Sequence, residues 1–224
     1  MFSQFYNKSL RKLVVGFGAL FNNIYVNHEN PDDLNNPLNI RVPITYAPQE
    51  KFIRRLLEPS SINDTTRIEN QLPRLSYIMT TINPDSGRRR TKFIPLFGSN
   101  QSGEDCLPTG NLINEQIPVN VGFNLFVYTR HIDDTLQIVE QIMPYFNPDH
   151  VIELSLNDVQ SNVRIPIIMT SSNINERFDG DFGSRRINIS SLSFVAKSFV
   201  YGKVIPSVSS ITTAGLCFGV DYDE

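Results

Sequence analysis

The stretch NVGFNLFVYTRHIDDTLQIVEQIMPYFNP, residues 120–148, contains the two clearest structural signals in the chain. Its first part alternates apolar residues with others, which predicts a half-buried strand over residues 120–130. The alternating apolar set is Val121, Phe123, Leu125 and Val127. In its second part five apolar residues recur at spacings of 4, 3, 4 and 3, and these are Ile132, Leu136, Val139, Met143 and Phe146. This period places all five on one face of a helix, so we expect them to pack against the core.

The same stretch carries start and stop signals for the helix. Asp134 followed by Gln137 fits a capping box, in which the two side chains satisfy free amides of the first turn. Asp133 and Asp134 also place negative charge at the positive end of the helix dipole. Helix capping is therefore the simplest role for both aspartates, and Pro144 and Pro148 close the segment.

Outside this stretch the chain favours strands over helices. An amphipathic pattern over residues 3–20 predicts a helix that Gly16 and Gly18 end, and Pro48 suits the first turn of a second, short helix with Phe52, Ile53 and Leu56 on one face. Extended patterns bounded by polar turns predict further strands at residues 19–28, 40–46, 74–82, 151–159, 163–170 and 187–201.

Two segments lack a regular period. Residues 83–119 are longer than ordinary connections, and loops of this length are usually functional, so we expect an interaction arm. Residues 202–224 end in acidic residues, and we expect them to form a C-terminal arm or tail. The whole pattern predicts a single domain, residues 1–224, of the α/β (α+β) class. We expect a mixed, mostly antiparallel sheet that is flanked by a few helices and carries long loop arms.

Composition and charge narrow the classes of function. A net charge of -3 and a pI near 5.7 give no global basic field that would concentrate nucleic acid or an anionic membrane. No stretch reaches the ~18–20 apolar residues that span a bilayer, and residues 13–21 are too short and glycine-broken for a signal peptide. Cys106 and Cys217 are too few for a disulfide framework, so we interpret both as reduced thiols in a cytosolic assembly environment.

Residue patterns for catalysis are weak. His28, His131 and His150 have none of the i, i+4 spacing that zinc hydrolases use. His131 with Asp133 can be drawn as an acid–base pair, but capping already accounts for the aspartate. The chain has no GxSxG, Walker or GxGxxG motif, and a turn explains the DGD at 179–181. We therefore expect no enzyme, and no catalytic, cofactor-binding or metal-binding residue.

Two runs of arginine are candidates for a protein interface. Arg88, Arg89 and Arg90 form the one basic triplet, inside the expected arm, and Arg185 and Arg186 form a pair before the last predicted strand. Guanidinium groups suit bidentate pairing with carboxylates across subunit boundaries. In a polar loop such a run is either a solvated surface or the contact for an acidic partner.

Six blocks of sequence, in this order, point to one family: FYNKSLRK (5–12), LFNNI (20–24), IRVPITYAPQEKF (40–52), IENQLPR (68–74), LFVYTRHIDDTLQIVEQIMPYFNP (125–148) and, more weakly, DGDFGSRRINISSLSF (179–194). They resemble the tail sheath stabiliser and tail terminator (tail completion) proteins of contractile-tailed bacteriophages. The resemblance spans about residues 1–201. Residues 83–119 and those after 201 are too divergent to transfer anything.

This resemblance implies a homohexameric ring of mixed α/β subunits, without catalysis, at the head-proximal end of the tail. The ring would terminate tube and sheath polymerisation and attach the neck. The implied partners are tail sheath, tail tube or tube-terminator and neck proteins, with genomic DNA passing through the lumen without specific binding and no membrane. The implied location is the virion tail, after assembly in the host cytoplasm. Because ring interfaces bury aromatic and arginine side chains, Phe93 and Phe97 join the arginines as candidates.

Two alternatives stay open on the sequence alone. Another tail, neck or baseplate component, such as an adaptor ring or a tube terminator, would share a small α/β architecture. A soluble hydrolase that uses His131 and Asp133 is the remote alternative.

Overall fold

The computed structural model describes residues 4–28, 38–51, 72–89, 96–99, 109–113, 116–156, 160–177 and 187–209. The elements in chain order are α1 (Ser9–Leu20), β1 (Tyr25–His28), β2 (Leu38–Arg41), β3 (Ile44–Tyr46), β4 (Arg74–Pro84), η2 (Ser86–Arg88), β5 (Leu96–Ser99), β6 (Thr109–Ile113), β7 (Gln116–Thr129), α3 (Ile132–Ile142), η3 (Met143–Phe146), β8 (His150–Leu156), β9 (Gln160–Arg177), β10 (Ile187–Tyr201) and β11 (Val204–Ser209). Both η elements are short 3-10 helices. The predicted α/β class is confirmed.

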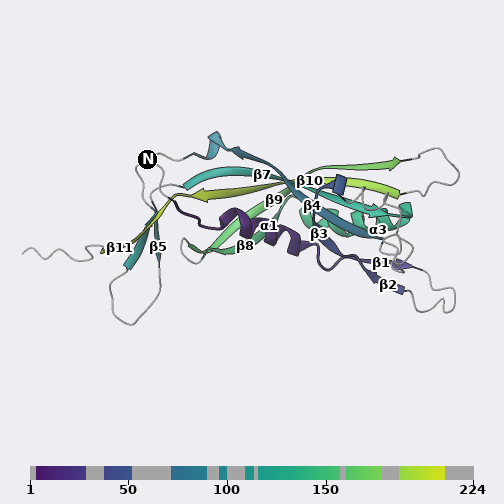
Figure 1. Ribbon diagram of the computed structural model, residues 1–224, viewed down its shortest axis with the longest axis horizontal. Helices are drawn as coiled ribbons and strands as arrows, with labels where there is room; N and C mark the ends of the chain where they lie inside the picture. The colour runs from purple at the N-terminus through teal and green to yellow at the C-terminus, as the bar shows by residue number, and fades with distance from the viewer. Residues whose placement is uncertain are drawn as a thin grey trace, which may run out of the picture.

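A six-stranded sheet in the order β3-β4-β7-β10-β9-β8 forms the body of the molecule. The short β3 runs parallel to β4, and every other neighbouring pair is antiparallel. Two small sheets lie at opposite ends of the elongated subunit (Figure 1): the three strands β11-β6-β5 at one end, and the hairpin β1-β2 beside α3 at the other. The sheet is therefore mixed and mostly antiparallel, as the sequence predicted.

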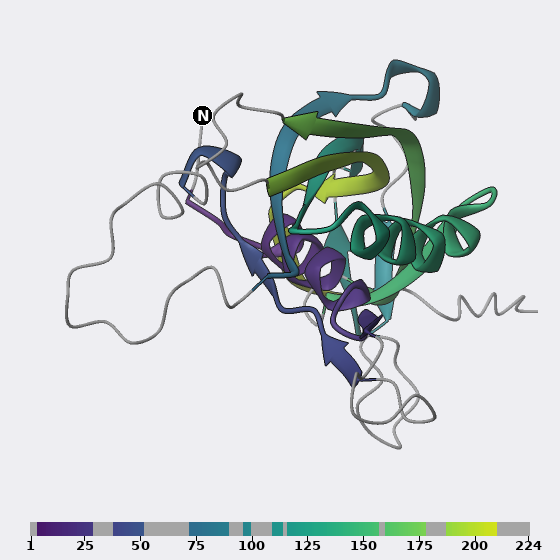
Figure 2. The ribbon, with the colours of Figure 1, turned by 90° about the vertical axis from the view of Figure 1, so that its right-hand side faces the viewer.

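The sheet curls around α1 and α3, which lie against the same face (Figure 2). The four alternating residues of β7, Val121, Phe123, Leu125 and Val127, are all 0% exposed and point into this main core. The opposite face of β7 contributes to a second, smaller cluster around Tyr128. Both faces of β7 are therefore covered, and β7 and β10 are the two central strands of the sheet.

Helix α1 packs an aromatic cluster onto the sheet. Phe17 stacks on Phe123 of β7 with ring centroids 4.4 Å apart, and it meets Phe194 of β10 edge-on at 5.4 Å. The prediction that Gly16 and Gly18 end this helix is wrong, since α1 continues to Leu20. Gly18 lies against Tyr77 of β4, and a Cβ at this position would come within 2.3 Å of the Tyr77 Oη. Glycine is therefore needed here because the helix backbone approaches the Tyr77 ring closely, and not because the helix ends.

Strand predictions succeeded where the apolar period was clear. Predicted strands at 74–82, 120–130, 163–170 and 187–201 correspond to observed strands, with β9 extending well beyond its predicted bounds. The stretch predicted at 40–46 is divided between β2 and β3, and the strand predicted at 151–159 is observed as β8, with residues 157–159 outside the described residues. The strand predicted at 19–28 is limited to β1, because helix α1 occupies its first residues. The helix expected after Pro48 begins at residues 49–51, and its remainder lies outside the described residues.

The two segments without a period also contain strands. Within residues 83–119 the structure has η2, β5 and β6, and within residues 202–224 it has β11. These strands pair with one another, β5 with β6 and β6 with β11. β11 lies far along the chain from its partner β6, and a local apolar period does not reveal pairing between distant segments. Both segments therefore contain strands that the sequence did not predict, while their role as arms stays a prediction.

Helix α3 is confirmed, but its predicted core face is only partly right. Val139 and Phe146 are buried, whereas Ile132, Leu136 and Met143 are 37%, 43% and 49% exposed. The stripe that meets the sheet is instead formed by Thr135, Ile138, Val139, Ile142 and Phe146. The hydroxyl groups of Thr135 and Thr129 lie 2.6 Å apart, which satisfies a buried polar group. A search for regularly spaced apolar residues does not identify this buried face of α3, because one of its members is a threonine.

Candidate assembly interface

The first turn of α3 brings together the residues that were predicted as helix caps. The N-cap residue is His131, which makes no side-chain cap hydrogen bond, so the capping box built on Asp134 is wrong. Asp133 and Asp134 do lie in the first turn, where negative charge favours the helix dipole. Asp134 is buried and its Oδ1 lies 2.9 Å from the His28 Nε2. The histidine that meets an aspartate is thus His28, on β1.

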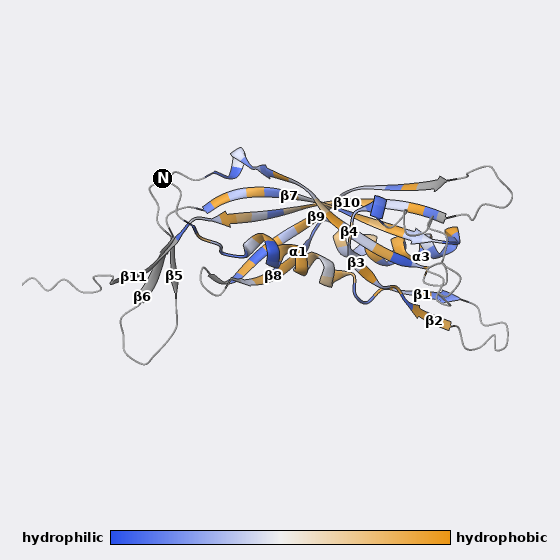
Figure 3. Cartoon of the chain, viewed as in Figure 1, coloured by the Kyte–Doolittle hydropathy of each residue, from blue (hydrophilic) through white to orange (hydrophobic). Residues whose placement is uncertain are grey.

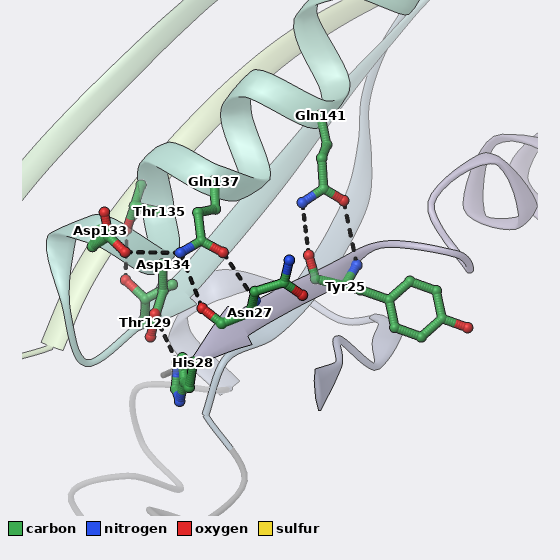
Figure 4. Close-up of polar contacts among 9 residues, drawn as sticks. All are labelled: Tyr25, Asn27, His28, Thr129, Asp133, Asp134, Thr135, Gln137 and Gln141. Carbon is green, nitrogen blue, oxygen red and sulfur yellow. Dashed lines mark hydrogen bonds and ion pairs between the residues drawn. The ribbon is translucent and has the colours of Figure 1, made fainter. Parts of the chain in front are cut away.

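Strand β1 is fastened along α3 by two glutamines, as Figure 4 shows. The Gln137 Oε1 accepts a hydrogen bond from the Asn27 amide at 2.9 Å, and its Nε2 donates to the Asn27 carbonyl at 3.2 Å. One helical turn later, the Gln141 Oε1 accepts a hydrogen bond from the Tyr25 amide at 3.4 Å, and the Gln141 Nε2 donates to the Tyr25 carbonyl at 2.6 Å. Four residues of a helix rise about as far as two residues of a strand, roughly 6 Å, so side chains at i and i+4 reach alternate residues of β1. The two side-chain amides thus make the backbone hydrogen bonds that a neighbouring strand would make.

A second polar cluster holds the turn after β4. The Arg88 Nε donates to the Asp85 Oδ2 at 2.7 Å, and its Nη2 donates to the Asn120 Oδ1 at 3.0 Å. The guanidinium carbon also lies 5.4 Å from the centre of the Phe199 ring on β10. The hydrogen bond from Arg88 holds the pKa of the Asp85 carboxyl below its usual value. Arg88 thereby ties η2 to the central strands of its own chain.

The other sequence-predicted interface residues are placed only in part. Arg89 is exposed at the end of η2. Of Phe97 the structure describes the backbone alone, within β5. The remaining candidates, Arg90, Phe93, Arg185 and Arg186, lie outside the described residues. The role of these candidates in an interface therefore stays a prediction.

An apolar surface that the sequence assigned to the core lies on the outside of α3. It consists of Ile132, Leu136 and Met143, with Tyr145 of η3 next to it. Figure 3 shows hydrophobic residues on α3 and on β2 at this end of the molecule. A cavity of about 560 Å³ opens between the last turn of α1 and η3, lined in part by Leu20 and Tyr145. Exposed apolar area of this kind is typical of contact surfaces.

The described residues offer little for chemistry. No three histidine, cysteine, aspartate or glutamate side chains among them are grouped to hold a metal ion. Within the same part of the chain, every helix is too short or too polar to cross a membrane.

Comparison with known proteins identifies the family. A family model described as "T4-like virus Myoviridae tail sheath stabiliser" matches residues 4–223. The chain belongs to this tail sheath stabiliser family. It is also 33% identical, over 225 residues, to the tail completion protein gp15 of Enterobacteria phage T4. That alignment covers 95% of this chain and 78% of the T4 protein.

Membership of the sheath stabiliser family establishes a structural role in a phage tail. The family is described as a stabiliser of the tail sheath, and the T4 relative is named as a tail completion protein, so both are structural tail proteins. The longest block of the family resemblance, residues 125–148, forms the end of β7, α3 and η3 and contributes buried residues to the core. Residues shared for core packing do not show which surface a family member uses for assembly. The assembly surface must therefore be inferred from the structure.

Proposed function

We propose that this protein forms a hexameric ring at the head-proximal end of the contractile tail. There it terminates polymerisation of tube and sheath and provides the attachment surface for the neck and head. The observation that carries the proposal is the sheath stabiliser match over residues 4–223, together with the name of the T4 relative, which refers to tail completion.

The shape of the subunit supports a capping role. A tail polymer grows because each added ring exposes a surface that binds the next ring. A terminator binds that surface on one side and presents a different surface on the other. The two ends of this subunit are built from unlike elements, the sheet β11-β6-β5 and the β1-β2 hairpin with α3. Unlike ends suit a protein that joins two different partners.

The charge of the chain supports a lumen through which DNA passes without being held. At a net charge of -3 the subunit has no general attraction for phosphates. Binding of purified protein to duplex DNA, measured as a function of salt concentration, tests this part. Tight binding at physiological salt would contradict a passive lumen.

The experiment that tests the ring position is removal of the protein from assembling phage. We expect electron microscopy to show tails that are not joined to heads, with tube and sheath ends of uneven length. Supplying the native chain from a plasmid should restore joined particles. Joined tails of normal length without the protein, or antibody labelling at the baseplate end, would refute the proposal and favour another tail component.

Arginine variants test the interface candidates. Arg89→Ala should keep the fold and lower the yield of joined particles, because its side chain is exposed. Arg11→Ala, an exposed arginine on α1, is the matched control and should leave the yield unchanged. Arg88→Ala should act differently and lower the stability of the chain itself, since Arg88 makes its described contacts within the subunit. Normal yield from Arg89→Ala would remove this residue from the interface.

A further inference from the structure

Two strands of the main sheet continue past the strands that cover their outer sides. β3 pairs with β4 only at residues 75–77, while β4 continues to Pro84. β8 pairs with β9 only as far as Ile167, while β9 continues to Arg177. No strand within the described ranges pairs with the outer side of residues 78–84, the β4 edge, or of residues 168–177, the β9 edge.

The two edges lie on opposite sides of the sheet and toward opposite ends of the subunit. β4 runs on past β3 toward the end that holds β5, and β9 runs on past β8 toward the end that holds β1 (Figure 1). The strands β4, β7, β10 and β9 alternate in direction, so β4 and β9 of one chain run in opposite directions. One subunit therefore presents two free edges of opposite direction, one on each side.

The chemistry of both edges favours pairing with another strand. Neither edge carries a charged side chain before Glu176, and the two begin alike, as MTTIN at 79–83 and MTSSN at 169–173. Each has an exposed isoleucine, Ile82 at 42% and Ile174 at 43%. Proteins usually blunt a free edge with charges or cover it, because its unpaired backbone groups are a template for a further strand.

Other edges of the same subunit are protected in these ways. The backbone of β1 is covered by Gln137 and Gln141. The edge strand β8 carries the charged Glu153, whose Oε1 lies 2.8 Å from the Nε of Arg164 on β9. The β4 and β9 edges have a bulge near their start, at the register shifts around Thr80 and Thr170, and carry other blocking residues only at their far ends, Pro84 on β4 and Glu176 and Arg177 on β9. Beyond each bulge the register is regular again, so a pairing surface remains.

We propose that the β9 edge of one subunit pairs in antiparallel direction with the β4 edge of the next copy, so that the sheet continues around the ring. This inference rests on the proposed ring and names the surface that closes it. A rotation about a ring axis preserves strand direction along the axis, so β9 meets β4 of the next copy antiparallel. β3 covers the part of β4 at one end of the sheet, and β8 covers the part of β9 at the other end. For the two free edges to meet, each copy must be shifted relative to the next along the strand direction, as strands are in a closed barrel.

Unlike edges are needed for a ring. If β4 paired with β4 of a second copy, the contact would be isologous and would stop at a dimer. Pairing of β4 with β9 leaves a free β4 edge and a free β9 edge after every addition, until the last copy meets the first. Two complementary edges on one chain therefore supply the heterologous contact that a closed ring requires.

Cysteine cross-linking tests the contact directly. In a background with Cys106 and Cys217 replaced by serine, Thr81→Cys and Ser172→Cys are combined in one chain and treated with a short bismaleimide. Both positions are exposed. We expect a ladder of covalent multimers on a denaturing gel, with neighbouring positions on each edge scanned to cover the register. Val15→Cys with Ser172→Cys is the control, since Val15 is exposed on α1, and it should give no ladder.

Charged substitutions test the same contact without a cross-linker. Ile82→Lys and Ile174→Lys should each raise the concentration needed for multimers by about tenfold or more, because a buried unpaired charge opposes association. Ile117→Lys is the matched control: Ile117 is also 42% exposed, but it lies on β7, where it pairs with Val200 of β10, and on neither of the two edges. Circular dichroism of each variant should match the native chain.

Native mass spectrometry over a concentration series separates failure of this inference from failure of the ring. Multimers with ladders, weakened by both lysine variants, support the pairing. Multimers without any ladder, and unaffected by the lysines, overturn the edge contact and leave the ring proposal standing. Covalent dimers from Thr81→Cys alone show a like-with-like contact and overturn the pairing of unlike edges. A strict monomer at every concentration contradicts self-assembly into a ring, and the edge pairing with it.

Discussion

Two glycines in α1 offer a sharp test of how this helix lies on the sheet. Gly16 and Gly18 are two residues apart in the same helix, so alanine at either position gains the same helix propensity, about 1 kcal/mol. Their surroundings differ. A Cβ at position 18 would lie 2.3 Å from the Tyr77 Oη and 2.6 Å from its Cζ, whereas a Cβ at position 16 meets two flexible side-chain tips, those of Leu154 at 3.0 Å and Ile152 at 3.5 Å.

These contacts decide the sign of each change. Tyr77 is buried and its ring packs against Phe17 and Tyr46 at 5.6 Å and 5.2 Å between centroids, so it has little room to retreat. Overpacking of a core costs about 1–3 kcal/mol, and an overlap this deep belongs at the upper end of that range. Gly18→Ala should therefore lower the free energy of unfolding by about 2 kcal/mol after the gain in helix propensity. Gly16→Ala should range from neutral to about 1 kcal/mol more stable, since a leucine methyl shifts easily.

Urea unfolding of the two variants and the native chain, at one protein concentration, measures the difference. Gly18→Ala combined with Tyr77→Phe should recover part of the loss, because the hydroxyl group makes the shortest contact. If Gly18→Ala proved as stable as Gly16→Ala, the helix would not approach Tyr77 as described. The aromatic core built on that approach would then need revision.

Three further predictions follow from other contacts. Val139→Asp should cost several kcal/mol, because it places a charge on the buried side of α3, whereas Leu136→Asp, on the exposed side, should change thermal stability by less than about 0.5 kcal/mol. Gln141→Ala should cost about 1–2 kcal/mol and speed hydrogen exchange along β1, and Glu140→Ala, its exposed neighbour, should do neither. Burial raises the pKa of the Tyr128 phenol above its ordinary 10.0, so its contribution to stability is complete below about pH 10 and is lost as the pH rises toward the folded pKa. Urea midpoints of Tyr128→Phe should accordingly fall less steeply above pH 10 than those of the native chain, and an equal slope would contradict this.

Sequence reasoning succeeded where one face of an element is apolar throughout. The alternation in β7 gave both its position and its core face, because every second residue there is a large apolar side chain. In α3 the same reasoning found the helix and missed its orientation. The predicted face and the buried face of α3 have Val139 and Phe146 in common. The buried face also includes Thr135, whose hydroxyl group is hydrogen-bonded to that of Thr129. Only the tertiary partner reveals which stripe is the inner one.

The candidate site was less predictable, because its contacts are long-range. Nothing local indicates that Gln137 and Gln141 contact the backbone of β1, more than a hundred residues earlier. Their i, i+4 spacing was a usable signal, but it is common on helices. Likewise Arg88 looked like part of a free basic run until Asp85 and Asn120 were placed beside it. The β4 and β9 edges depend on where β3 and β8 stop, which strand length alone does not reveal.

The place of β10 in the sheet constrains how this chain is made. β10 lies between β7 and β9, yet it follows both of them along the chain. A ribosome that has released only the residues before Ile187 has produced two half-sheets that lack the strand joining them. The core must then close after synthesis is nearly complete, and such late, long-range pairing is slow and exposes strand edges meanwhile. A nonsense mutation anywhere upstream of this strand should yield an aggregating fragment that chaperones and proteases remove, with no partly working subunit.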